Sequence, residues 1–190
     1  VRVRLLLDDI NATGKDGVYL ALDAHDNIAV RLFNPSRARD GGLRRGVEMA
    51  LRAFSVTRRM HNKAWVADGR LAIVGGRNIG DQYFDAAEAS NFRDMDLMLM
   101  GPAVRQTEEV FDAYWNSEVS MPIRALAGEG EGQLERLRGN LAELALSERA
   151  RPYIERALER ISALSMLDSA LATHWTSEAR IVSDPPEKAL

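Results

Sequence analysis

Histidine, lysine, aspartate and asparagine stand at fixed spacing in one stretch, His61 to Asn78, which reads HNKAWVADGRLAIVGGRN. The pattern is H-x-K-x-x-x-x-D, then six residues, then G-G-x-N. His61 is one of three histidines and Lys63 one of three lysines. An imidazole can act as a nucleophile near neutral pH, and an ammonium group and an amide can hold an anionic phosphoryl group. The stretch therefore predicts phosphoryl chemistry, with His61 as nucleophile and Lys63 and Asn78 as phosphate ligands.

A β-hairpin is expected to carry these side chains. Trp65-Val66 and the run from Leu71 to Val74 favour two strands, and Asp68-Gly69 between them is a strong two-residue turn signal. Because strand side chains alternate, His61, Lys63 and Trp65 are predicted to share one face. Asp68 is a candidate site residue, but its place in the turn indicates a structural, orienting role.

The glycine pair after the second strand has two interpretations. Gly75 and Gly76 have no side chains, so a phosphate could approach the backbone closely there. They could equally form a β-bulge with no ligand. Further on, the alternation from Asp94 to Met100 predicts another strand, with Asp94 and Asp96 on one face.

Strand, helix and strand follow one another before the motif, at residues 1–7, 18–24 and 28–33. That order predicts parallel neighbours in an α/β layer. Residues 37–59 hold seven arginines against two acidic residues, and residues 43–56 show a helical apolar stripe. This basic segment is either a solvated surface helix or a face for phosphate and anionic lipid headgroups.

Helices dominate the second half of the sequence. Pro102 is expected to begin a helix whose apolar stripe enters the core. The stripe comprises Val104, Thr107, Phe111, Tyr114 and Trp115. A GEGEG run at 128–132 predicts a boundary, followed by helices near 134–144 and 154–171 and a short strand at 179–183.

Composition narrows the class of protein only a little. The chain has 190 residues, 46% hydrophobic and 28% charged, with a net charge of -3, which is ordinary for a globular domain and excludes a globally basic nucleic-acid binder. With no cysteine there is no disulfide or cysteine zinc site. No apolar run reaches the roughly 20 residues of a membrane helix. The abrupt start on VRVRLLLDD suggests a fragment of a longer protein.

The motif resembles the signature of the phospholipase D superfamily. The surrounding words RRMHNK, LAIVGGRNIGDQYF, FRDMDLMLMGPAV and FDAYWNS resemble the first motif region of bacterial cardiolipin synthases, C-type branch. The resemblance implies an α/β fold with a mixed, helix-flanked β-sheet. It also implies a partial first lobe at residues 1–122, a helical linker at 123–175 and the start of a second lobe at 176–190.

The same resemblance assigns roles to the site residues. His61 is implied to form a phosphohistidine or to act as the acid–base partner, with Lys63, Gly75, Gly76 and Asn78 around the phosphate. Asp94 is implied to orient the histidine. No metal or cofactor is implied. Many family members have serine at the position of Gly76, so that hydroxyl contact is missing here.

The implied reaction is phosphatidyl transfer between phospholipids, from phosphatidylglycerol or another glycerophospholipid. The implied partners are a second motif-bearing lobe, from the same parent chain or a partner protomer, and the surface of the bacterial cytoplasmic membrane, to which the protein would be peripheral. Two alternatives stay open. The same intermediate could be resolved by water, as in a phosphodiesterase or nuclease, or the isolated chain could be inactive because its second histidine is absent.

Overall fold

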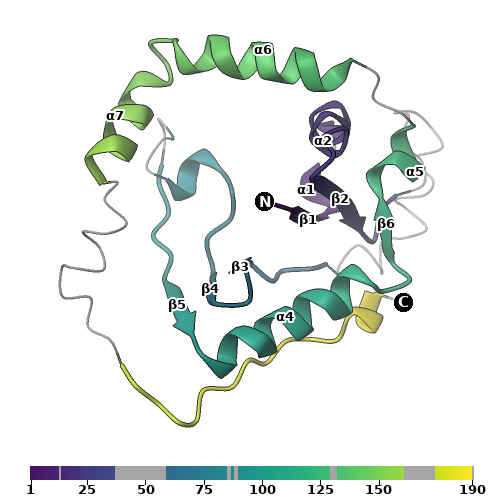
Figure 1. The fold of residues 1–190 in the computed structure, drawn as a ribbon, viewed down its shortest axis with the longest axis vertical. Coiled ribbons are helices and arrows are strands. Elements are labelled where there is room, and N and C mark those ends of the chain that lie inside the picture. The colour runs from purple at the N-terminus through teal and green to yellow at the C-terminus, as the bar shows by residue number, and fades with distance from the viewer. Residues whose placement is uncertain are drawn as a thin grey trace.

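The fold is α/β, with strands in two small sheets and helices around them (Figure 1). The structure, a computed structural model, describes residues 1–12, 14–36, 59–84, 87, 90–128, 132–160 and 174–189. The predicted fold class is confirmed, but the strands fall into two three-stranded sheets instead of one mixed sheet. The predicted basic helix at 43–56 lies outside the described residues.

The first sheet contains the predicted strand–helix–strand unit. β1 (Val3–Asp8) and β2 (Ile28–Phe33) are parallel, and α2 (Asp16–Asp23) connects them after the short α1 (Asp9–Ala12). A third strand, β6 (Ser120–Pro122), pairs antiparallel with β2 and was not predicted. Apolar side chains of α2, β2 and the following α5 (Ile123–Ala127) form its core. They include Leu20, Val30, Leu32 and Ile123.

The second sheet contains the predicted hairpin and the strand after it. β3 (Ala64–Ala67) and β4 (Leu71–Gly75) are antiparallel, and β5 (Asp96–Met100) pairs antiparallel with β4. Asp68 and Gly69 both have positive φ, 51° and 64°, as an Asp-Gly turn requires, but Ala67 pairs with Leu71, so Arg70 is a third residue of the loop. The hairpin prediction is therefore confirmed.

Helix α4 (Pro102–Trp115) joins the two sheets. It begins with Pro102 in the first turn, as predicted, and packs on all three strands of the second sheet. Near its end, the ring of Tyr114 lies 5.1 Å from the ring of Phe33 in β2. Val104, Thr107, Tyr114 and Trp115 are buried, so the prediction that this stripe is core is confirmed for them.

The C-terminal segment runs beside α4 (Figure 1). The Ile181 amide donates to Gln106 Oε1 at 2.9 Å, and the Tyr114 hydroxyl donates to the Asp184 carbonyl at 2.9 Å. The predicted strand at 179–183 is wrong, because these residues pair with no strand of the described chain. The segment ends in a short 3₁₀ helix, η2 (Pro186–Ala189), whose Ala189 is buried near Phe33 and Tyr114.

Helices α6 (Gln133–Ala145) and α7 (Arg151–Arg160) follow α5. α6 confirms the predicted helix at 134–144 and contacts α2. α7 confirms the first part of the predicted helix at 154–171, whose remainder lies outside the described residues. Among the described helices, none combines the length and the apolar character that crossing a membrane would require.

Candidate active site

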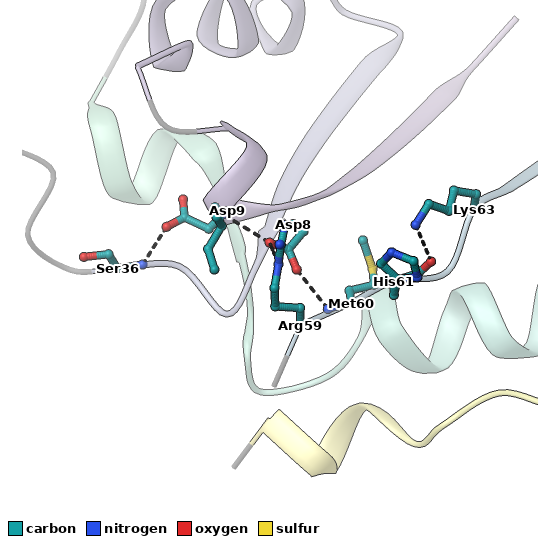
Figure 2. A network of polar contacts seen from close by, with 8 residues as sticks. Asp8, Asp9, Ser36, Arg59, Met60, His61 and Lys63 are labelled. Atoms are coloured by element: carbon teal, nitrogen blue, oxygen red, sulfur yellow. Dashed lines mark hydrogen bonds and ion pairs between the residues drawn. The ribbon is translucent and has the colours of Figure 1, made fainter. Parts of the chain in front are cut away.

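His61 and Lys63 lie in an irregular segment that leads into β3. The prediction that both belong to the strand is wrong, because β3 begins at Ala64. The segment is nevertheless held against the hairpin, since the Gly75 amide donates to the Lys63 carbonyl at 3.3 Å. The Lys63 ammonium group turns back and donates to the His61 carbonyl at 2.8 Å (Figure 2). His61 is exposed and Lys63 is half-buried.

The glycine pair brings Asp94 to the motif. A Cβ on Gly76 would collide with the Asp94 carboxylate, so the carboxylate fills the space that a side chain would need. A Cβ on Gly75 would lie 2.6 Å from the Met95 carbonyl oxygen and 2.8 Å from the Asp96 Cα. Gly75 is therefore required by the close approach of β5, and Asp94 stands just before that strand instead of inside it.

Three charged residues act on the Lys63 ammonium group. Burial lowers the pKa of its ammonium group, and the nearby Arg59 guanidinium lowers this pKa further. The carboxylates of Asp94 and Asp8 act in the opposite direction and raise it. Lys63 therefore shares one electrostatic environment with Asp94, Asp8 and Arg59.

Asn78 stands on the loop after the glycine pair. Its amide donates to the Tyr83 hydroxyl at 2.8 Å, and Tyr83 belongs to the short 3₁₀ helix η1 (Asp81–Tyr83). The loop is also held by Arg77, which bonds Asp96 at 2.6 Å and the Tyr83 carbonyl at 2.6 Å. These contacts fix the loop beside the end of β4.

Asp68 is separated from the other candidates. It occupies the hairpin turn, whereas the contact between Lys63 and Gly75 closes the opposite end of the hairpin. Its exposed side chain and positive φ agree with the structural role predicted for it. The structure thus brings Lys63, Gly75, Gly76 and Asp94 together and leaves Asp68 at the far end.

The implied bond between Asp94 and the histidine stays a prediction. The His61 carbonyl accepts a hydrogen bond from Lys63, but within the described residues the His61 ring makes no hydrogen bond to Asp94. The Asp94 carboxylate instead lies against Gly76, and its charge raises the pKa of the Lys63 ammonium group. The other two histidines lie elsewhere: His25 accepts a hydrogen bond from the Asn27 amide, and His174 is exposed.

Two residues beside the motif were not identified from the sequence. Asp8, at the end of β1, accepts a hydrogen bond from the Met60 amide at 2.9 Å and pairs with Arg59 at 3.5 Å (Figure 2). The sequence does carry a signal for Asp8, the acidic pair Asp8-Asp9 at the end of an apolar strand. Polar groups at the carboxyl end of a strand often line a site in α/β folds.

Curated relatives of the chain carry cardiolipin synthase names. The chain is 37% identical to "Cardiolipin synthase C" of Escherichia coli over 99% of its own length and 39% of that protein's. It is 34% identical to "Cardiolipin synthase A" of Pseudomonas putida over 56% of the chain and 24% of the relative. It is 37% identical to "Cardiolipin synthase 1" of Staphylococcus aureus over 40% of the chain and 15% of the relative. No protein-family model matches the chain.

The chain belongs to the phospholipase D-type family of phospholipid synthases, as its motif region predicted. More narrowly, it is a homologue of the bacterial cardiolipin synthases, and the likeness to Cardiolipin synthase C confirms the predicted resemblance to the C-type branch. The chain spans about two fifths of that relative's length, 39%.

Proposed function

We propose that this chain forms one motif-bearing part of a phosphatidyltransferase of the cardiolipin synthase type. One observation carries the proposal: Lys63, the Gly75–Gly76 pair and Asp94 converge beside the segment that bears His61. An ammonium group and an adjacent imidazole are what an anionic phosphodiester needs for binding and attack. The names of the homologous proteins support the choice of a phospholipid as substrate.

The proposed reaction has two balanced steps. A ring nitrogen of His61 attacks the donor phosphorus, the phosphorus–oxygen bond to the headgroup alcohol breaks, and a second histidine gives that oxygen its proton. The hydroxyl of the acceptor phospholipid then attacks the phosphohistidine, its proton passes to the second histidine, and the phosphorus–nitrogen bond breaks. His61 could equally fill the acid–base role, with the other histidine as nucleophile.

Lys63 would neutralise charge on the phosphoryl oxygens. An ammonium group has three N–H donors, and the bond to the His61 carbonyl uses one of them. The Asn78 side-chain amide would also donate to the phosphate. To do so it would exchange one hydrogen bond, the one that it donates to the Tyr83 hydroxyl. Asp94 would steady the charge on Lys63 or on the histidine, as a carboxylate does beside an imidazolium.

The second histidine would come from a second motif, on the same polypeptide or on a partner protomer. Under this proposal residues 1–122 form most of one lobe, 123–175 a linker and 176–190 the entry to the other lobe. The chain's 39% coverage of Cardiolipin synthase C leaves room for such a lobe in a protein of that length. Acting on phospholipids would place the protein at the surface of a bacterial cytoplasmic membrane.

The test is product formation from labelled phosphatidylglycerol by the complete product of the gene, with His61→Ala as the variant. Cardiolipin with released glycerol is expected from the wild type and neither from the variant. His174→Ala is the matched control, because His174 is exposed and outside the motif. Phosphatidic acid in place of cardiolipin would identify a hydrolase, and full activity of His61→Ala would refute the assignment.

The isolated chain gives a second arm of the same test. General acid catalysis contributes typically about 100- to 10,000-fold, so a site with one histidine should be slower by a factor in that range. Turnover of the monomeric 190-residue chain at the rate of the complete gene product would contradict the need for a second motif.

A further inference from the structure

Two adjacent carboxylates are buried where β1 ends. Asp8 is 8% exposed and Asp9 is 4% exposed. Buried carboxylates are rare unless hydrogen bonds or opposite charges compensate them. One Asp8 oxygen accepts from the Met60 amide at 2.9 Å, and the other accepts from the Ile10 amide at 3.1 Å and pairs with the Arg59 guanidinium at 3.5 Å (Figure 2). Asp8 is therefore well compensated, and its partners lie beside the His61 motif.

The Asp8 contacts join the two sheets at the motif. Asp8 belongs to β1 of the first sheet, whereas Met60 lies directly before His61 on the path into the second sheet. At the other end of the short segment that bears His61, the Lys63 carbonyl accepts a hydrogen bond from the Gly75 amide. The short segment bearing His61 is thus fixed on both sides, by a buried carboxylate before it and by a backbone hydrogen bond after it.

Asp8 and Arg59 also act on Lys63 with opposite signs. Arg59 lowers the pKa of the Lys63 ammonium group, after burial itself, and Asp8 raises it together with Asp94. A guanidinium beside an ammonium group that must stay charged is unfavourable unless a carboxylate compensates it. Asp8 is in contact with Arg59 and supplies that compensation.

We propose that Asp8 and Arg59 are a positioning pair for the His61 site: Asp8 fixes the backbone from which His61 projects, and the pair balances the charge beside Lys63. Neither residue needs to touch the phospholipid. The catalytic consequence rests on the proposed function, whereas the charge coupling to Lys63 does not.

Asp9 provides a matched control within the same turn. Asp9 is buried like Asp8, and it accepts a hydrogen bond from the Ser36 amide at 2.9 Å, on the side of Asp8 that faces away from the motif segment (Figure 2). Its charge is not among those that act on Lys63. Asp9→Asn therefore removes a neighbouring buried charge that is not among those acting on Lys63.

The direct experiment is a pH titration of Lys63 by NMR with lysine labelled at Cε. The chain has only three lysines, so three signals are expected, and Lys15→Arg and Lys188→Arg assign them. Asp8→Asn should move the Lys63 titration to lower pH, and Arg59→Gln should move it to higher pH. Asp9→Asn should leave it in place, and Lys188 serves as the internal reference.

Opposite shifts in the two variants support the proposal, because general loosening of the fold would move both titrations toward that of an ordinary lysine. An unchanged Lys63 titration in Asp8→Asn overturns it. Should Asp8→Asn fail to fold, Arg59→Gln is compared with Arg59→Lys, which keeps the positive charge: an upward shift in Arg59→Gln alone supports the pair, and equal titrations in the two variants overturn it.

Kinetics of the complete gene product give the second readout. Misplacement of a reacting group by about 1 Å can cost on the order of 100-fold in rate, so Asp8→Asn should lower kcat by roughly 10- to 100-fold. KM should change much less, since the pair does not contact the substrate. If the wild type makes no product, the proposed function fails while the titration still tests the pair.

Discussion

The Cα of Gly76 lies against the carboxylate of Asp94, so that a Cβ built on Gly76 would stand 2.9 Å from the Asp94 Cγ. The Asp94 carboxylate can occupy this position only because residue 76 has no side chain. A serine at position 76 would have to displace the carboxylate before its hydroxyl could serve a phosphate.

Gly76→Ala is expected to destabilise the protein by about 1–3 kcal/mol, the usual cost of forcing an extra carbon into occupied space. In an Asp94→Ala background most of that cost should disappear, because the colliding group is a side chain. Urea denaturation of the four proteins of this double-mutant cycle measures the coupling. Simple additivity would mean that the two residues are not in contact.

Gly75→Ala is the informative contrast. Its added carbon would meet backbone as well as the Asp96 side chain, with the Met95 carbonyl oxygen at 2.6 Å. Backbone cannot rotate away, so the destabilisation should persist in an Asp96→Ala background.

Replacement of Asp68 should separate turn geometry from chemistry. Asp68 has a φ of 51°, a conformation that asparagine adopts readily and alanine does not. Asp68→Asn should keep both stability and activity, whereas Asp68→Ala should cost about 1 kcal/mol of stability. The measurements are urea midpoints and product formation by the complete gene product. Loss of activity in a stable Asp68→Asn variant would assign the carboxylate a chemical role.

The stability of the fold should depend on the ionisation of Lys63. Burial, followed by Arg59, lowers the pKa of this ammonium group from its ordinary value of 10.5 in the folded protein. Between the lowered folded pKa and 10.5, the unfolded chain therefore binds more protons, and stability rises with pH. The variant Lys63→Met lacks this effect.

The difference in unfolding free energy between wild type and Lys63→Met should thus shift in favour of the wild type as pH rises through that window. Denaturation of both proteins at a series of alkaline pH values checks the sign. A difference that moves the opposite way would mean that Lys63 gains net stabilisation of its charge in the fold.

Tyr114→Phe should loosen the C-terminal segment. The Tyr114 hydroxyl donates to the Asp184 carbonyl at 2.9 Å, and its loss should cost about 0.5–1.5 kcal/mol, a typical net value for one hydrogen bond. Amide hydrogen exchange at residues 180–189 should accelerate relative to the exchange in β2. Tyr153→Phe is the control, since Tyr153 is 53% exposed on α7. Equal exchange in Tyr114→Phe and wild type would show that the other contacts, the Ile181–Gln106 hydrogen bond and the buried Pro186 and Ala189, are enough to hold the segment.

Local sequence signals determined much of this protein. The Asp68-Gly69 turn, the Pro102 helix start and the strand–helix–strand order each depend on residues adjacent in sequence, and the structure confirms all three. The family was also recognisable, because the motif and its flanking words are contiguous. The spacing alone put Lys63 and the glycine pair at one end of a hairpin.

Long-range contacts decided the rest. β6 is only three residues long and exists because β2 offers a free edge partner, whereas residues 179–183 have strand-like composition but find no such partner in the described chain. The division into two sheets likewise depends on pairing between distant segments. Asp8 lies 52 residues from Met60, so only the folded chain brings its carboxylate to the His61 motif. Its role follows from burial and hydrogen bonding, which no local pattern of residue types encodes.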